Sequence, residues 1–234
     1  MIRKDLDMAI KKEEVVQMPP IEMNRVLVTI EGITPLLIHR FDPKAERMML
    51  EAQKQSTQNK TKKREAKNEW ADLIGATYWL DEKEPAEMTE EAFHAAITAG
   101  AKTGFPITGV KQAAISAAYR KKWVPNQTEL KATMFLKGLD QAEMLTINGM
   151  PEMKMDHVRI GAGKTADIRF RPIYREWEAS FILEYDANGG WSLNNLVNII
   201  NAGGMFVGIG EWRPEKDGDF GRFKVKAITE LKDE

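Results

Sequence analysis

Asn201-Ala-Gly-Gly-Met-Phe-Val-Gly-Ile-Gly-Glu-Trp-Arg-Pro-Glu-Lys-Asp-Gly-Asp-Phe-Gly-Arg-Phe-Lys-Val225 is the stretch from which the rest of this chain can be interpreted. Glycines at this density indicate a backbone that adopts positive φ or that approaches another segment closely. Loops mounted on a regular scaffold often carry function. A long hairpin with wide turns would have the same composition, so function needs further evidence.

Regular elements flank this loop on both sides. Leu193, Leu196, Val197 and Ile200 have the i, i+3, i+4, i+7 spacing of an amphipathic helix over 192–202. We predict that Gly203-Gly204 ends that helix. Alternating apolar residues predict a strand over 175–185 before the helix and another over 221–229 after the loop.

The upstream chain supplies the remaining elements of one domain. Alternation predicts a strand over 23–31, and helices are expected over 89–101 and 110–123, the second with an alanine face suited to close packing. Short strands are expected over 77–80, 131–136, 142–147, 157–160 and 166–171. This order predicts an α+β fold: a ferredoxin-like (RRM-like) βαββαβ core with insertions, an antiparallel sheet and helices on one face.

Two segments do not fit the predicted core. Residues 1–22 have mixed charge, end near Pro19-Pro20, and are interpreted as an N-terminal arm. Within the single domain 23–234, a basic insertion at about 42–71 lacks the apolar residues needed to bury surface, and we expect it to be mobile. Both segments are expected to connect neighbouring protomers, although the insertion has the composition of any solvated loop.

The overall composition excludes several classes of site. The chain has no cysteine, and its histidines, His39, His94 and His157, are far apart, so disulfides are excluded and no metal site or cofactor is expected. No apolar run approaches the ~20 residues of a membrane span, and we expect a cytoplasmic protein. Because the net charge is −1, any binding of a polyanion must use local basic patches.

Particular residues resemble a known family. Phe105-Pro-Ile-Thr-Gly-Val-Lys-Gln-Ala-Ala-Ile-Ser-Ala-Ala118 is similar to the helix start of the RAMP superfamily, the CRISPR-associated RNA-binding proteins. Lys111 keeps the basic position of that motif, whereas Gln112 and Ser116 replace its usual glycine and arginine. The loop quoted above resembles the superfamily's glycine-rich loop, with an interruption at 212–216, and the segment 32–36 resembles the end of its opening strand.

The resemblance implies a core that holds single-stranded nucleic acid, most closely as a backbone subunit that polymerises along a guide RNA. A stand-alone relative carried by a phage or mobile element would coat single-stranded DNA or RNA. We therefore expect non-catalytic, largely sequence-independent binding of a single strand, coated by protomers in a head-to-tail filament.

The expected nucleic-acid contacts combine cations with a stacking ring. Arg169 and Arg171 share one strand face because side chains alternate along a strand. Trp212 would stack on a base, or else hold the loop against the core, and Phe220 and Phe41 are further stacking candidates. The candidates are His39, Arg40, Lys60, Lys62, Lys63, Arg64, Lys111, Arg159, Lys164, Arg169, Arg171, Trp212, Arg213, Arg222 and Lys224.

Alternative functions remain open at this point. Gly161-Ala-Gly-Lys-Thr165 is not a P-loop, because Val158 occupies the place of the first glycine and a strand-like segment follows. His39 would serve a metal-independent, RAMP-type endoribonuclease as acid or base. A third alternative is a protein-interaction or structural module, or a mimic of a CRISPR subunit, that binds no nucleic acid.

Overall fold

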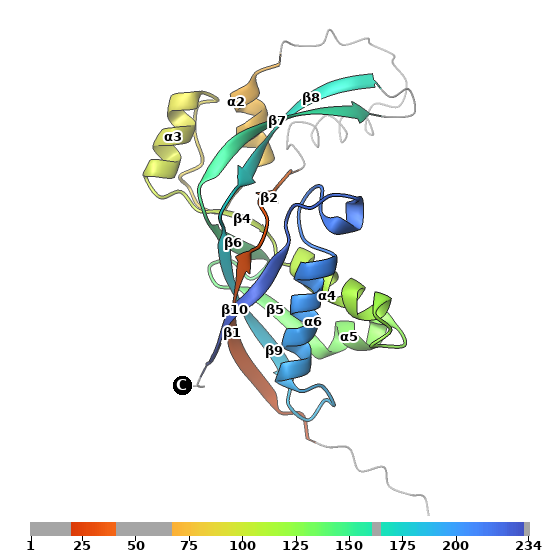
Figure 1. Ribbon diagram of the computed structural model, residues 1–234. Coiled ribbons are helices and arrows are strands. Elements are labelled where there is room, and N and C mark those ends of the chain that lie inside the picture. Colours follow the sequence, from red (N-terminus) through yellow and green to blue (C-terminus); the bar gives the residue numbers. More distant parts are fainter. Residues whose placement is uncertain (1–19, 41–66, 161–164, 232–234) are drawn as a thin grey trace, which may run out of the picture.

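The computed structural model describes residues 20–40, 67–160 and 165–231, and its main sheet is antiparallel (Figure 1). Its strands lie in the order β10-β1-β9-β6-β4-β3, and β5 pairs with β9 as well. They are β1 (Met23–Gly32), β3 (Tyr78–Trp79), β4 (Thr103–Pro106), β5 (Met134–Gly138), β6 (Met144–Asn148), β9 (Glu178–Asp186) and β10 (Phe223–Glu230). Since β5 and β6 share one edge of β9, the first four positions, β10, β1, β9 and β5/β6, follow the ferredoxin-like order, and the predicted α+β fold is confirmed.

Two helices cover one face of this sheet (Figure 1). They are α4 (Thr108–Arg120) and α6 (Leu193–Phe206), and α5 (Gln127–Thr133) follows α4. Val28, Ile30 and Phe181 of the sheet are fully buried together with Ile115 of α4 and Ile200 of α6. Burial of such side chains contributes roughly 1.5–3 kcal/mol each, so this layer supplies the main core.

The glycine pair of α6 has a different role from the one predicted. Gly203 and Gly204 lie inside the helix, which ends at Phe206 with Val207 as its C-cap, so the prediction that they terminate it is wrong. A Cβ on Gly203 would lie 2.6 Å from the backbone N of Ala114. The pair therefore lets α6 approach the buried alanine face of α4, and that face is confirmed as a packing surface.

The strands expected over 157–160 and 166–171 are present, as parts of a longer hairpin. It consists of β7 (Pro151–Ile160) and β8 (Thr165–Tyr174), and β2 (Leu36–Leu37) joins it in a second sheet. By contrast, the strand expected over 131–136 is wrong in its first half. Asn126 caps the backbone N–H groups of Thr128 and Glu129, and this cap starts α5 before the strand begins at Met134.

A second, smaller core supports the hairpin. Leu73 and Ile74 of α2 (Glu69–Ala76) and Phe93 of α3 (Glu90–Thr98) are buried, and Met153 and Phe170 pack against them. The helix expected over 89–101 is confirmed, with Thr89 as its cap. The last residues of the insertion predicted at 42–71 belong to α2, and 42–66 lie outside the described residues, as do 1–19 of the predicted arm.

No helix in the described ranges is both long and apolar enough to cross a membrane.

Candidate nucleic-acid interface

The open face of the main sheet is covered by ion pairs. Arg25 Nε lies 3.3 Å from a carboxylate oxygen of Glu184, and Lys137 Nζ lies 2.8 Å from the other. Lys224 Nζ lies 2.7 Å from Glu31, and its hydrogen bond to that carboxylate lowers the pKa of Glu31. Lysines on this face therefore neutralise carboxylates of neighbouring strands. The candidate Lys224 is one of these ion-paired lysines.

The glycine-rich loop after α6 is fixed to the chain that follows β1. Glu211 N–H donates to the Leu37 carbonyl at 2.8 Å, and Gly221 N–H donates to the Pro35 carbonyl at 2.8 Å. Gly210 has a φ of 76°, and a Cβ there would collide with the Leu37 backbone. The close approach inferred from the glycine content is therefore present at this position.

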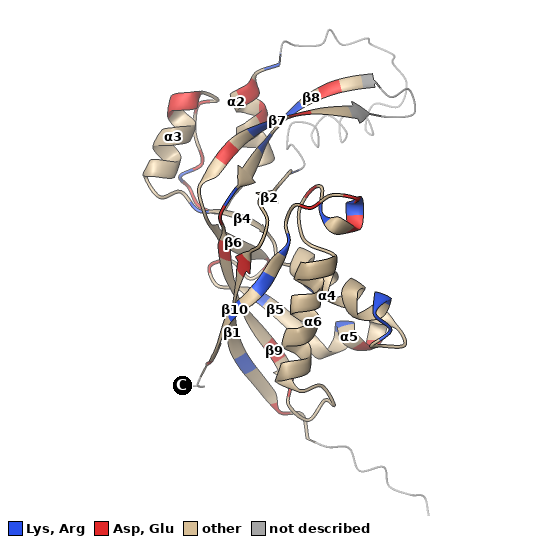
Figure 2. Cartoon of the chain, in the orientation of Figure 1, with Lys and Arg blue, Asp and Glu red and all other residues tan. Residues whose placement is uncertain are grey.

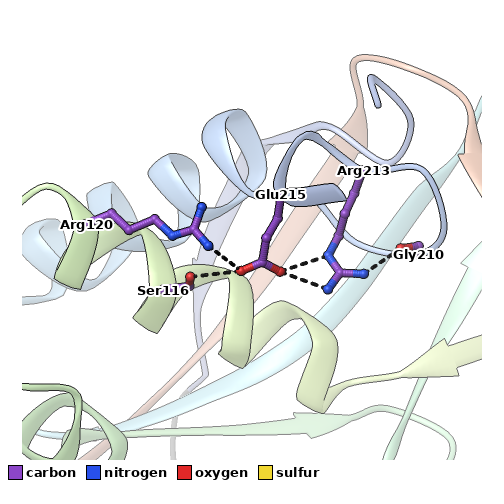
Figure 3. A network of polar contacts seen from close by, with 5 residues as sticks. All are labelled: Ser116, Arg120, Gly210, Arg213 and Glu215. Atoms are coloured by element: carbon purple, nitrogen blue, oxygen red, sulfur yellow. Dashed lines mark hydrogen bonds and ion pairs between the residues drawn. The ribbon is translucent and has the colours of Figure 1, made fainter. Parts of the chain in front are cut away.

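A carboxylate network ties the same loop to α4 (Figure 3). One oxygen of Glu215 accepts from Arg120 at 2.8 Å and from Ser116 at 3.2 Å. The other accepts from Arg213 Nη2 at 2.8 Å, and Arg213 Nη1 donates to the Gly210 carbonyl at 2.9 Å. The candidate Arg213 is thus a structural residue of the loop in this conformation.

The charged face of the hairpin meets the other side of the loop. Arg171 is only 1% exposed, so it does not present the surface cation that the sequence predicted. Its Nη2 donates to Asp156 at 2.6 Å, and its Nη1 lies 3.6 Å from Glu211. The reason is register, because Asp156 pairs with Arg169 across the hairpin and lies on the same face as Arg171.

Trp212 projects from the loop beside this buried pair. It is 49% exposed, so the alternative in which its ring holds the loop against the core is not what the structure shows. Its φ of 52° is left-handed, which is uncommon for a residue other than glycine and is often found at functional positions. Phe220 N–H donates to the Trp212 carbonyl at 3.0 Å, which brings a second ring to the same turn.

Two cations contact rings in this region, one at Phe220 and one at Tyr78. Lys154 Nζ is 5.9 Å from the centre of the Phe220 ring, and the guanidinium of Arg40 is 5.9 Å from that of Tyr78. Burial raises the pKa of Tyr78, and the charges of both Arg40 and Glu211 reach its hydroxyl. We name this region the loop–hairpin junction, and it consists of Arg40, Tyr78, Lys154, Arg169, Arg171, Glu211, Trp212 and Phe220.

The remaining candidates are separated from one another. Lys111 Nζ donates to the Lys131 carbonyl at 3.0 Å, and burial lowers the pKa of Lys111. Arg222 donates to the Met205 carbonyl at 3.3 Å, and Arg159 lies in β7 opposite Ala166. His39 directly precedes Arg40. Lys60, Lys62, Lys63, Arg64 and Lys164, and Phe41 with them, lie outside the described residues. The structure therefore does not bring all the candidates to one surface.

Sequence reasoning missed Lys154 and Tyr78. Lys154 alternates with Asp156 along β7, but the sequence gives no sign that this strand pairs with β8 and faces the loop. It also missed a polar cleft of about 500 Å³ between α4 and the loop, which Gln112, Ser116 and Gly208 help to line. Within the part of the chain that is described, no three His, Cys, Asp or Glu side chains form a group able to hold a metal ion.

Comparison with known proteins gives a structural match but no family. No protein-family model matches the sequence, and no curated protein matches it. One similar solved chain belongs to the cryo-EM structure of the Type III-B Cmr-beta bound to cognate target RNA, with 12% sequence identity and a TM-score of 0.47. The match covers 90% of this chain and 61% of that chain, so this chain spans less than two thirds of its length.

Proposed function

We propose that this protein binds single-stranded nucleic acid at the loop–hairpin junction without cleaving it. The observation that carries the proposal is Trp212, a half-exposed ring held at a left-handed backbone angle in a loop fixed at both ends. An exposed ring among cations is the arrangement that binds single strands with little sequence preference, because every base has a face on which to stack.

The surrounding charge supports a phosphate backbone beside the stacked base. Arg40 and Arg169 contribute positive charge at the junction, while Lys154 and Arg171 are both paired with Asp156, and Arg171 also with Glu211. The basic residues 60–64 lie outside the described residues, and Lys67, which follows them, donates to Asp167 at 2.9 Å. A strand bound here would therefore meet cations from more than one segment.

RRM-like folds bind RNA on the open sheet face, but the ion pairs on that face in this protein favour the junction as the binding site. RRM domains stack bases on aromatic residues of the open sheet. Here, Thr29 and Ser180 meet at the centre of that face and share a hydrogen bond, and charged pairs flank them. Using that surface would require breaking these pairs, whereas the ring of Trp212 is already exposed.

The test is fluorescence anisotropy with labelled single strands of DNA and RNA, with a duplex of the same sequence as the control. We expect binding to both single strands, weaker binding to the duplex, and a linear fall of log K with log salt as counterions are released. Binding that does not respond to salt, or that requires the duplex, would contradict the proposal. Electron microscopy of the same mixtures tests head-to-tail filaments, which would appear only with a bound strand.

Two other functions are tested by the same material. An endoribonuclease using His39 would produce cleaved RNA without metal, and His39→Ala would abolish the product. A protein-interaction module is favoured by a separate observation, an apolar groove along α6. Stable self-association in the absence of nucleic acid, with no anisotropy change for any strand, would support that module instead.

A further inference from the structure

An apolar groove of about 690 Å³ runs along α6 and is not part of the loop–hairpin junction. Trp123, Trp191, Met205 and Phe206 line it, with Asn195 and Asn198 between them. Trp123 is 49% exposed and Phe206 is 52% exposed, so large apolar side chains remain open to solvent next to one another. A contiguous patch of this kind marks a binding surface, unlike single exposed apolar residues.

One end of the groove is positively charged. Lys121 Nζ lies 4.0 Å from the centre of the Phe206 ring. Lys224 also lines the groove, but Glu31 balances its charge. Arg222 donates to the carbonyl of Met205 at the same end of α6. Charge complementarity therefore favours an occupant with apolar side chains followed by carboxylates.

The N-terminal segment of the chain enters at the other end. Asn188 Nδ2 donates to the Pro20 carbonyl at 3.0 Å, and Glu22 N–H donates to Asp186 at 2.9 Å. Trp191, which lines the groove, follows Asn188 by three residues, and the start of β1 lies beside the turn into α6 (Figure 1). Residues 1–19 are therefore attached at the Trp191 end.

We propose that the segment before Pro20 binds this groove in the same chain, with Val15, Val16 and Met18 against the aromatic lining. Glu14 and Glu13 come next toward the N-terminus, and their carboxylates complement the positive charge at that end of the groove. The lengths agree: α6 has 14 residues and is about 21 Å long at 1.5 Å per residue. The extended chain from Pro20 to Glu14 covers about 20 Å at roughly 3.3 Å per residue.

Because the segment is attached beside the groove, a segment of the same chain is favoured as its occupant over the segment of a second copy. A segment tethered next to its site has an effective concentration near the millimolar range, well above that of a free partner at ordinary protein concentrations. The proposal does not depend on nucleic-acid binding at the junction, and either can fail without the other.

The absence of cysteine makes a cross-linking experiment specific. In the full-length protein, Val16→Cys with Asn198→Cys supplies one thiol on the segment and one on the exposed lining of the groove. A short bismaleimide should join them within one chain, seen as a linked peptide by mass spectrometry and as a monomer on a denaturing gel. The control pair, Val16→Cys with Thr128→Cys on α5, should give no more than a tenth of that product.

Two outcomes would overturn the proposal. Equal yields from both pairs would show that the segment does not select the groove, and a product that links two chains would assign the groove to another copy. A second measurement needs no cysteine. Val15→Asp with Val16→Asp should raise the fluorescence of an apolar dye several-fold by opening the groove, whereas Gln17→Asp should not. An unchanged dye signal in the double variant would also contradict the proposal.

Discussion

Arg171 of β8 and Glu211 of the glycine-rich loop lie 3.6 Å apart, Nη1 to Oε2, and join two segments that are 40 residues apart in sequence. Asp156 holds the other side of the same guanidinium (Figure 2 shows the mixed charges along the hairpin). This buried cation fixes the position of the loop relative to the hairpin, and with it the position of Trp212. Stability and the geometry of the candidate interface are therefore linked at one residue.

Removing Asp156 should be strongly destabilising. Asp156→Ala leaves Arg171 buried with a weaker partner, and an unpaired buried charge typically costs about 3–5 kcal/mol. Urea denaturation should show this loss in the free energy of unfolding. The matched control is Glu152→Ala, which removes an exposed partner of Arg175 on the same strand and should cost less than about 1 kcal/mol. Equal effects would mean that Asp156 is not the main partner of Arg171.

Replacing Trp212 should weaken binding without unfolding the protein. Trp212→Ala should lower the affinity for single strands by about 1–3 kcal/mol if the ring stacks on a base. Trp123→Ala removes a ring with the same 49% exposure from the groove and should leave anisotropy titrations unchanged. If both variants bind like the parent protein, the junction is not the interface.

Arg169 should contribute through charge alone. Arg169→Gln should lower the affinity similarly for all sequences and reduce the salt slope by about 1, as expected when one phosphate contact is lost. Arg25→Gln, on the ion-paired sheet face, is the control and should leave the slope as it is. A greater effect at Arg25 would move the interface to the open sheet.

Adding a methyl group to Gly203 should destabilise the fold despite a better helix propensity. Alanine is favoured over glycine in a helix by about 1 kcal/mol, but the new Cβ would lie 2.6 Å from the Ala114 backbone. Thermal unfolding of Gly203→Ala should therefore occur at a lower temperature. Asn198→Ala, on the exposed side of the same helix, should be neutral or slightly stabilising, and a rise in both variants would contradict close packing.

Acid should release the loop from α4 through Glu215. Burial by itself would raise the pKa of Glu215, but the hydrogen bond and charge of Arg213, the charge of Arg120 and the bond from Ser116 outweigh it and lower the pKa. A lowered folded pKa gives stability that is present above the unfolded value, about 4.3, and is lost as the pH falls through the folded value.

Thermal unfolding from pH 6 to pH 3 tests this expectation. The parent protein should lose more stability on acidification than Glu215→Gln, because the variant has no carboxylate to protonate at that position. If the parent protein and the variant lose the same stability between pH 6 and pH 3, Glu215 contributes nothing to the pH dependence.

The sequence by itself determined most of the core elements and their order, although it missed α2 and α5. Period-two alternation identified β1, β9 and β10, and period 3.6 identified α6, because one face of each is buried against a single core. The alanine face of α4 was also readable, since small residues in a helix permit close packing whatever the partner is. That order was sufficient for the ferredoxin-like plan.

Only the tertiary structure decided which charges are available. Arg169 and Arg171 look alike in sequence, yet the pairing of β7 with β8 and the approach of the loop bury Arg171 between Asp156 and Glu211. Likewise, the sequence predicts that the helix ends at Gly203, and only the structure shows that this glycine packs against α4. Cations and glycines act through partners distant in the chain, and those partners are set by packing, not by local sequence.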